Sequence, residues 1–337
     1  MQLKDLLKTV CEAAGVNGQQ AVSQTVTELV SPLADEVKTD ALGNVIAYRY
    51  AAEQEAPALL LEAHMDQIGF RVVRVDEKGF VRVAACGGVD RRTLPASEVT
   101  VYGREAYRGV FGSVPPHLSK ENTVPEIEEM GIDLGLPPAE VKEAVKVGDA
   151  VAFTAAFHSM GEHRVCAPSL DNRAGVAAVI YALQLLKNCA LPCHVAALFA
   201  VKEEVGGHGA LAASFGIAPT AAVVTDVSFA AVPQEKACDC GQLGGGVMLG
   251  YSPVLDTVLT ARLQQLAEET TVLWQPEVMG GVTGTDADKI TVTRGGVPTA
   301  LLSVPLRYMH TPVEVADLRD IEAVGTLMAA LAKGGIA

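Results

Sequence analysis

Hydrophobic residues recur at two different spacings along the chain and divide it into three stretches. In the first stretch, the segment MQLKDLLKTVCEAAG has apolar residues at helical spacing with charges between them, and Gly15 is expected to end the helix. Residues 44–50 and 58–63 then have the pattern of strands. The second of these, ALLLEA, is an apolar run typical of a strand that is buried on both faces of a sheet.

The second stretch begins at Phe70 and has a different pattern, in which apolar and polar residues alternate. FRVVRV, the turn DEKG and FVRVAA predict a β-hairpin. Shorter strand-like pieces follow at residues 99–102 and 151–157, and proline and glycine interrupt the sequence often. We expect this stretch to form a separate small β domain.

In the third stretch, from Asp171 onward, helical and strand-like segments alternate. Helices are expected at residues 172–188, 206–216, 254–269 and 315–333, and strands at 194–201, 221–226 and 298–304. This alternation is typical of an α/β fold. We therefore predict an α/β domain, a mixed sheet flanked by helices, in residues 1–66 and 161–337, with residues 67–160 inserted as a small β-barrel-like domain.

Composition limits the kind of partner and the location. The 26 basic and 40 acidic side chains give a formal net charge of −14 without a cluster of lysine and arginine, which disfavours nucleic acid as a partner. We find no run of about 18 apolar residues for a membrane span. The amino-terminal segment has the pattern of a folded amphipathic helix and not of a signal peptide. The expected location is the cytoplasm.

The chain has seven cysteines, an odd number and too few for a scaffold held together by disulfides, which fits a reducing compartment. Two pairs, Cys189 with Cys193 and Cys238 with Cys240, raise the alternative of a small zinc site. Neither pair has the spacing of a recognised zinc motif, so we favour small buried or loop positions for all four.

Glu203 and Glu204 are adjacent carboxylates directly after the apolar run HVAALFAV. Bringing them together costs free energy, because like charges repel and burial penalises each charge. A bound cation would offset that cost. Residue types that bind divalent metals occur at four further positions: His64, Asp171, Asp226 and His310.

Most of these candidates follow a predicted strand. His64 follows residues 58–63, the two glutamates follow 194–201, Asp226 follows 221–225, and His310 comes shortly after 298–304. Because ligands of open α/β sheets bind beyond the carboxyl ends of the strands, we expect these side chains on one rim. Asp171 opens a helix instead, and a simple N-cap is the alternative there.

The charges of this set favour two metal ions over one. Asp171, Glu204 and Asp226 as ligands would contribute −3 and two divalent ions +4, which leaves +1, and a bridging hydroxide would bring the cluster to zero. A single ion would leave the site negative. Metal-bound water ionises near neutral pH, so the hydroxide is also the expected nucleophile.

Five segments resemble the signature segments of one known family, the tetrahedral aminopeptidases. They are AHMDQIGF, SLDNRAGVAAVI, KEEVGGHGA, VVTDVS and RYMHTPVEVADLRDI, in the order that the family has, between residues 62 and 321. These dinuclear metallopeptidases include glutamyl and deblocking aminopeptidases and are often labelled cellulase or endoglucanase. The resemblance implies a zinc-exopeptidase-like α/β domain.

The resemblance also implies a role for each candidate ligand. Asp171 would bridge two ions, with His64 and Asp226 completing the first site and Glu204 and His310 the second. Zinc or cobalt is expected in both sites, and manganese also suits such nitrogen and oxygen ligands.

Glu203 is implied as the general base, which takes a proton from the bridging water and passes it to the leaving amine. Asp66 would orient the imidazole of His64. Gln67 departs from the family, whose members often have Glu there, but no ligand role is assigned to it. For the segment GTDAD, two roles stay open: Asp286 caps the next helix, or the segment lies near the substrate cleft.

The leading functional hypothesis is a two-metal aminopeptidase that removes amino-terminal residues from peptides. The resemblance implies that the inserted domain, residues 67–160, mediates dimerisation and that dimers build a dodecamer. Two alternatives remain. One is a catalytically idle assembly or binding protein that keeps the ligands. The other is a glycan hydrolase, a class that usually works with a metal-free pair of carboxylates.

Overall fold

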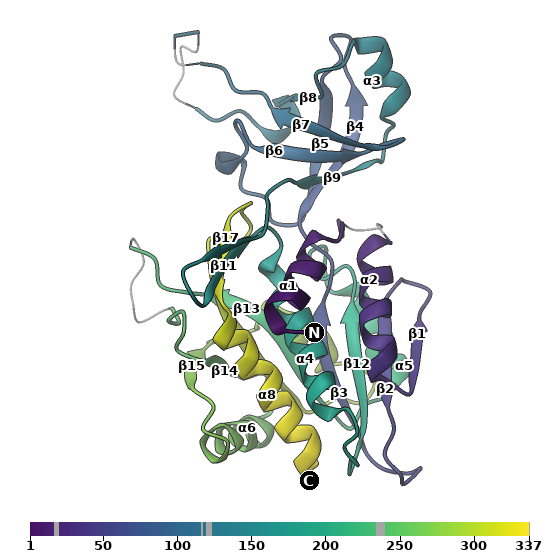
Figure 1. Cartoon of the computed structure of the whole chain (residues 1–337), viewed down its shortest axis with the longest axis vertical. Helices are drawn as coiled ribbons and strands as arrows, with labels where there is room; N and C mark the ends of the chain where they lie inside the picture. The colour runs from purple at the N-terminus through teal and green to yellow at the C-terminus, as the bar shows by residue number, and fades with distance from the viewer. Residues whose placement is uncertain (17–19, 116, 119–122, 234–239, 337) are drawn as a thin grey trace.

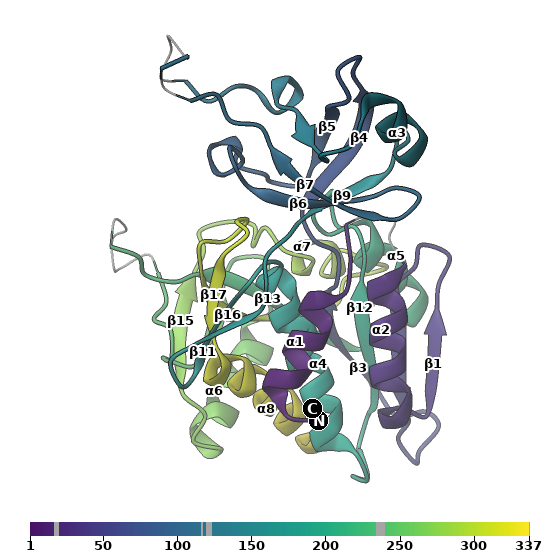
Figure 2. The ribbon, with the colours of Figure 1, turned by 45° about the horizontal axis from the view of Figure 1, so that its top comes forward.

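The computed structural model describes residues 1–16, 20–115, 117–118, 123–233 and 240–336. The described chain forms a layered α/β part and a closed β-barrel that stands beyond one end of the sheet (Figures 1 and 2). The architecture is the predicted one, a mixed sheet flanked by helices together with a small barrel.

The large sheet has eleven strands. In spatial order they are β1 (Glu36–Thr39), β2 (Val45–Arg49), β12 (His194–Ala200), β3 (Ala58–His64), β13 (Ala221–Phe229), β16 (Thr299–Arg307), β17 (Glu314–Asp317), β11 (Arg164–Ala167) and β10 (His158–Met160), while β14 (Val247–Tyr251) pairs with β16 and β15 (Trp274–Val278) with β14. The central strands β12, β3, β13 and β16 are parallel, so their carboxyl ends meet at one edge. The barrel lies beyond this edge, because β3 leads directly into it.

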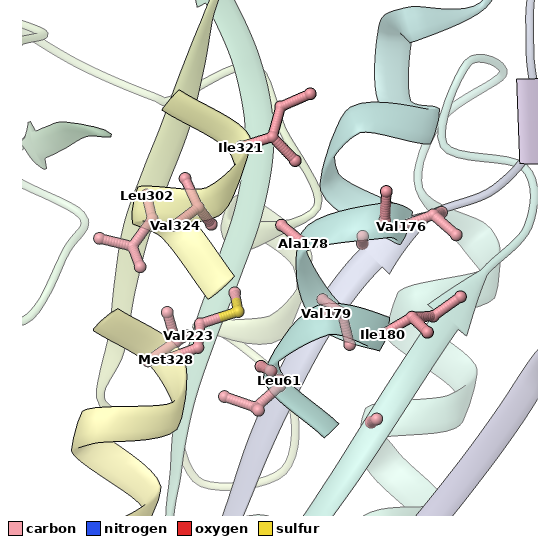
Figure 3. Close-up of a cluster of buried hydrophobic side chains, with 14 of the residues drawn as sticks. Leu61, Val176, Ala178, Val179, Ile180, Val223, Leu302, Ile321, Val324 and Met328 are labelled. Carbon is pink, nitrogen blue, oxygen red and sulfur yellow. The ribbon is translucent and has the colours of Figure 1, made fainter. Parts of the chain in front are cut away.

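Helices cover both faces of the sheet. One face carries α1 (Leu3–Glu12), α2 (Ala21–Val30), α4 (Leu170–Leu186), α6 (Thr257–Glu269) and α8 (Leu318–Gly334), and the other carries α5 (His208–Ile217) and α7 (Ala287–Ile290). Side chains alternate between these faces along each strand. Figure 3 shows Leu61, Val223 and Leu302 of three neighbouring strands packed with α4 and α8. Leu60 and His64 are an odd number of positions away from Leu61, so their side chains point to the opposite face, where α5 and α7 lie.

The barrel closes in the order β4 (Gly69–Val75), β5 (Val81–Cys86), β8 (Ile132–Asp133), β7 (Ala106–Phe111), β6 (Glu98–Tyr102) and β9 (Ala150–Phe153). Its core contains Phe70, whose ring makes edge contacts with Phe111 and Phe153 at centroid distances of 5.1 and 5.5 Å. The remaining helical pieces are α3 (Pro138–Ala144) and the 3-10 turns η1 (Ser31–Leu33), η2 (Arg91–Thr93) and η3 (Ile127–Glu129).

All barrel strands lie inside the segment 67–160 that we expected to be inserted, and the division of the chain into domains at those residues stays a prediction. The last residues of that segment, in β10, pair with β11 in the large sheet instead of in the barrel.

Several elements differ in length from the sequence expectation, and three of them lie at the carboxyl edge of the sheet or next to it. β13 and β16 run to Phe229 and Arg307, past the expected ends at 226 and 304, because the two strands continue to pair with each other. The last helix begins at Leu318 and not near 315, since residues 314–317 pair with β16 and β11 as β17.

The structure describes three of the four cysteines that were expected in small buried or loop positions. Cys193 is buried and its thiol lies 3.6 Å from the carbonyl oxygen of Ala332, while Cys189 lies 3.6 Å from that of Leu185. Cys238 lies outside the described residues. Among the residues that are described, no helix combines the length and the apolar composition that crossing a membrane requires.

Candidate metal centre

The five expected metal ligands come from separate elements and meet at the carboxyl edge of the sheet. His64 is the last residue of β3, Asp226 lies in β13, and Asp171 is the second residue of α4. Glu204 and His310 lie in the turns after β12 and β16. They form two clusters that could each hold a metal ion, His64–Asp171–Asp226 and Asp171–Glu204–His310, and within each cluster the donor atoms lie within 4.8 Å of one another.

Asp171 belongs to both clusters and offers a different oxygen to each. Its Oδ1 lies 3.3 Å from Nε2 of His64, and its Oδ2 lies 3.1 Å from Nε2 of His310. The carboxylate thus lies between two imidazoles, which is where a ligand that bridges two ions has to lie. The alternative of a simple N-cap is not the observed geometry, because Asp171 and Asn172 have non-helical backbone angles and it is Oδ1 of Asn172 that accepts the N–H of Gly175 at 3.0 Å.

The spacing of the donor atoms fits metal ions of the expected size. Two ligand atoms at 2.0–2.1 Å from a tetrahedral ion lie roughly 3.3 Å apart. In the first cluster Nε2 of His64 is 3.5 Å from Oδ1 of Asp226, and in the second Nε2 of His310 is 3.6 Å from Oε2 of Glu204. Nitrogen and oxygen donors at these separations match what zinc, cobalt or manganese binds.

An oxygen atom faces the far nitrogen of each imidazole, and for His310 it forms a hydrogen bond that favours the tautomer a metal needs. Nδ1 of His310 lies 3.0 Å from the carbonyl oxygen of Gly88, in the barrel segment after β5. Because a carbonyl oxygen only accepts, Nδ1 carries the hydrogen and the lone pair of Nε2 faces Asp171 and Glu204. Nδ1 of His64 faces Oδ1 of Asp66 at 3.6 Å.

Glu203, the expected general base, lies beside the first cluster without belonging to either one. Its Oε2 is 4.0 Å from Nε2 of His64. Its backbone N–H donates to Oδ1 of Asp66 at 3.1 Å. Asp66 therefore contacts both the backbone of Glu203 and the region behind the imidazole of His64, and it links the two functional side chains.

Burial and crowding of like charges shift the pKa values of the glutamates strongly. Burial raises the pKa of Glu203 to about 8 and that of Glu204 to about 10, and neighbouring carboxylates add to each shift, Asp226 for Glu203 and Asp171 for both. Burial also raises the pKa of Asp226. Oε1 of Glu204 is buried without a hydrogen-bond partner among the described residues. Cations bound at this site would lower the free energy of these groups.

The pKa values of two further candidate ligands, His64 and Asp171, are shifted in the directions that ion pairing produces. Burial lowers the pKa of His64, but the carboxylates Asp226 and Asp171 outweigh it and hold this pKa well above its ordinary value. For Asp171, burial raises the pKa, and hydrogen bonds from His310 and His64 outweigh that effect and lower it.

Glu314 contributes to the site although the sequence analysis assigned it no role. Its side chain is buried and accepts two backbone hydrogen bonds, from the N–H of Asp171 at 3.1 Å and from the N–H of His310 at 2.8 Å. It therefore fixes the backbone of two of the candidate ligands. The available signal was an acidic residue inside the apolar strand of the segment PVEVAD.

Asn44 was missed as well. Its side chain is fully buried, where it donates to the carbonyl oxygen of Gly209 at 3.1 Å and accepts the N–H of Val201 at 2.9 Å. These two bonds hold the end of β12 against the start of α5. The turn that carries Glu203 and Glu204 lies between them.

A cavity of about 620 Å³ opens directly beside the two clusters. Besides the candidate ligands and Glu203, its described lining includes Ser228, Phe229, Met248, Pro276, Glu277, Val278, Met279, Ser303 and Met309. Thr283, Gly284 and Thr285 also line it, which places the start of the GTDAD segment at the cleft. Asp286 makes no side-chain cap bond to α7 and is buried beside Glu62 instead.

The fold and the paired ligand clusters define a class, the metal-dependent hydrolases built on an α/β sheet. Comparison with known proteins then identifies the family. The profile of the M42 glutamyl aminopeptidase family matches residues 43–327. A lysyl aminopeptidase of Pyrococcus furiosus is 35% identical over 97% of this chain and 96% of its own length. The chain belongs to the M42 family of aminopeptidases, the tetrahedral aminopeptidases of the sequence resemblance, and is a hydrolase.

Solved structures agree with this assignment over the whole chain. An aminopeptidase from the archaeon Desulfurococcus kamchatkensis superposes with a TM-score of 0.93 at 32% identity and covers 99% of this chain and 95% of its own. The TET1 peptidase of Pyrococcus horikoshii, described as assembling into a tetrahedron or a large octahedral shell, has a TM-score of 0.86 at 30% identity, with coverage of 98% and 99%.

Proposed function

We propose that this protein removes the amino-terminal residue from peptides with the help of two divalent metal ions. The observation that carries the proposal is the position of Asp171, which offers one carboxylate oxygen to each of two ligand clusters. His64 and Asp226 would hold the first ion with it, and Glu204 and His310 the second. When bound, such a pair of ions polarises the scissile carbonyl and makes a bridging water acidic.

Glu203 is the group that moves the proton in this proposal. It lies beside the first cluster without being a candidate ligand, so its carboxylate is free to accept a proton from the attacking water and donate it to the leaving amine. Asp66 accepts the backbone N–H of Glu203 and faces His64, which supports a role in orienting both.

The variant Glu203→Gln tests this assignment, since it keeps the shape of the side chain and removes the proton acceptor. We expect kcat on an aminoacyl substrate to fall roughly 10²- to 10⁴-fold, while elemental analysis still finds two metal ions per chain. Glu204→Gln is the matched comparison, because it should lower metal content as well. Normal turnover of Glu203→Gln with both metals bound would exclude Glu203 as the base.

The same assays separate the two alternatives. No hydrolysis of any aminoacyl reporter with zinc, cobalt or manganese added would indicate a catalytically idle assembly protein. Release of sugar from cellulose that survives chelation would indicate a glycan hydrolase, because such enzymes work with carboxylates alone.

We also propose that the protein self-associates through the inserted barrel and that dimers build a dodecamer. Support comes from its similarity to the TET1 peptidase, whose description states that it forms closed shells. The barrel carries exposed apolar side chains, among them Val110 and Val114, which association would bury. The cytoplasmic location and the absence of a nucleic-acid or membrane partner stay predictions of the sequence.

A further inference from the structure

A carboxylate that neither cluster uses lies in the cavity beside the metal centre. Glu277 belongs to β15, its strand pairs with β14, and β14 pairs with β16 through Met248 and Ser303. Ser303 is in turn the register partner of Asp226 in β13. Glu277 is opposite Gly250 in β14, two positions from Met248, so Glu277, Met248, Ser303 and Asp226 lie on one face of the sheet. Glu277 is on the cavity wall next to the first cluster.

Two hydroxyl groups hold the Glu277 side chain in place. Oγ of Ser303 donates to Oε2 of Glu277 at 2.6 Å, and the hydroxyl of Ser228 forms a second hydrogen bond with the carboxylate. Hydroxyl donors at this length favour the ionised acceptor. Burial, together with the nearby carboxylate of Asp226, raises the pKa of Glu277, and the two hydrogen bonds offset only part of that rise.

Glu277 has no cationic partner within the protein as described. No lysine or arginine occurs among the described residues that line the cavity, and no described lysine, arginine or histidine nitrogen lies within 4.0 Å of its carboxylate. A carboxylate that is partly removed from water without a counter-charge is costly, and a ligand that brings a positive charge offsets this cost.

Part of the remaining cavity wall is apolar and deformable. Met248, Met279 and Met309 line it, together with Phe229 and Pro276. Methionine adapts to flexible aliphatic groups, and the methylene stems of lysine and arginine pack well on such surfaces while the charged head reaches a polar group. The cavity thus combines an acidic group outside the metal centre with apolar side chains beside it.

We propose that Glu277 selects peptides whose amino-terminal residue has a cationic side chain, lysine or arginine. The inference rests on the proposed aminopeptidase function and names the substrate class of that site. The names of the compared proteins do not decide which substrates are preferred, because the family is described as glutamyl aminopeptidase and one relative as lysyl aminopeptidase. The competing role for Glu277 is to bind the α-ammonium group that every peptide substrate has.

The experiment uses the full-length protein with its metal content measured. We compare kcat/KM on anilide substrates of lysine, arginine, methionine and glutamate, for the unsubstituted protein and for Glu277→Gln. We expect lysine to be preferred over methionine, which has a similar length and no charge, and the Glu277→Gln variant to lower the lysine-to-methionine ratio roughly 10- to 100-fold. Metal content should not change.

Two further variants sharpen the result. Glu268→Gln, an exposed position on α6, should leave the ratio unchanged. Glu277→Asp keeps the charge with a shorter side chain, so it should retain part of the lysine preference even if the glutamine variant folds poorly.

Three outcomes would overturn the inference: a preference of the unsubstituted protein for methionine or glutamate over lysine, an equal loss on all substrates in Glu277→Gln, or an unchanged ratio. The second would assign Glu277 to the α-ammonium group. Calorimetric affinities for free lysine and free methionine provide a readout that needs no turnover. If no substrate is hydrolysed at all, the proposed function fails, whereas a lysine preference in binding that Glu277→Gln removes would still support this inference.

Discussion

At the scale of single residues, the site depends on side chains that hold the candidate ligands as well as on the ligands themselves. Glu314 accepts the backbone N–H groups of Asp171 and His310 with its two oxygens. Since both N–H groups lie in a buried or half-buried setting, loss of the acceptor would leave them unsatisfied and free the backbone of both residues to move.

We therefore expect Glu314→Ala to weaken metal binding roughly 10- to 100-fold, the usual effect of removing a group that orients metal ligands. Glu314→Gln keeps the size of the side chain and one acceptor oxygen, so it should lose less. Titration against a competing chelator measures the affinities. An alanine variant that binds metal as tightly as the unsubstituted protein would show that Glu314 has no orienting role.

Metal binding should also release protons. Burial raises the pKa of Glu204 to about 10, so without metal this group holds a proton at pH 7. The pKa of His64 and that of His310 are raised as well, by neighbouring carboxylates. Because ligands bind metal in their deprotonated form, the apparent affinity should rise as the pH is raised from 7 toward 10.

Calorimetric titration of the metal-depleted protein in two buffers with different ionisation enthalpies counts the released protons. We expect a net release at pH 7 that shrinks as the pH approaches 10. Net proton uptake, or an affinity that does not change over this range, would contradict the raised pKa values.

The sequence allowed the clustering of the candidate ligands to be predicted at this scale, because each is a metal-binding residue type placed at or near the end of a strand or the start of a helix, and their binding of metal stays a prediction. Glu314 and Asn44 could not be predicted in the same way. Asp171 lies 143 positions from Glu314, and Gly209 and Val201 lie more than 150 positions from Asn44, so only the tertiary structure brings these partners together.

At the scale of elements, the approach of α5 to β12 fixes the turn that carries Glu203. A Cβ built on Gly209 would lie 2.0 Å from the carbonyl oxygen of Val201 and 2.5 Å from Oδ1 of Asn44. Only glycine fits this contact, since neither the backbone of Val201 nor the buried Asn44 has room to move.

Gly209→Ala is expected to destabilise the protein by about 1–3 kcal/mol and to lower kcat, because α5 has to move away from β12. Gly216→Ala is the matched control in the same helix, since nothing lies within 4 Å of a Cβ there. It should stabilise the helix by up to about 1 kcal/mol. Urea unfolding measures the free energy of unfolding of both variants. Equal stability of the two would show that Gly209 is not held tightly against Val201 and Asn44.

Element types were predictable because the buried strands are continuous apolar runs and the barrel strands alternate. The positions at which elements end were less predictable. β13 continues past Asp226 because its backbone still pairs with β16, and no local signal in the sequence marks where that pairing stops. The start of α8 was placed too early for the same reason, since residues 314–317 pair in the sheet.

At the scale of the whole molecule, the proposed assembly can be tested on the barrel surface. Val110 and Val114 are 43% and 64% exposed. Replacing both with glutamate should shift the population from large assemblies toward small species, because burying these charges at an interface is unfavourable. Val258→Glu is the control, at a side chain of α6 that is 78% exposed and far from the barrel in Figure 1.

Sedimentation velocity measures the distribution of species for all three proteins. A distribution that the double variant leaves unchanged would argue against an interface at this part of the barrel. A protein that sediments as single chains at every concentration would contradict self-association itself.

The order of segments was enough to predict that the barrel interrupts the α/β part. What the sequence did not indicate is that the barrel contributes to the metal centre. Gly87 and Gly88 follow a barrel strand, and nothing in their composition distinguishes them from turn glycines elsewhere in the chain.

Yet the carbonyl oxygen of Gly88 is the acceptor that determines which nitrogen of His310 carries the hydrogen, and Gly87 lies close to Glu204, whose Oε2 would be 3.0 Å from a Cβ at that position. A variant from which the insertion had been removed would keep all five candidate ligands, but Nδ1 of His310 would lose its acceptor. The hydrogen of that imidazole could then be on either ring nitrogen, and only one of these two tautomers leaves Nε2 free for a metal ion. Under the proposed function we therefore expect the smaller part of the molecule to be a component of the catalytic apparatus, and the larger part alone to be a poorer enzyme.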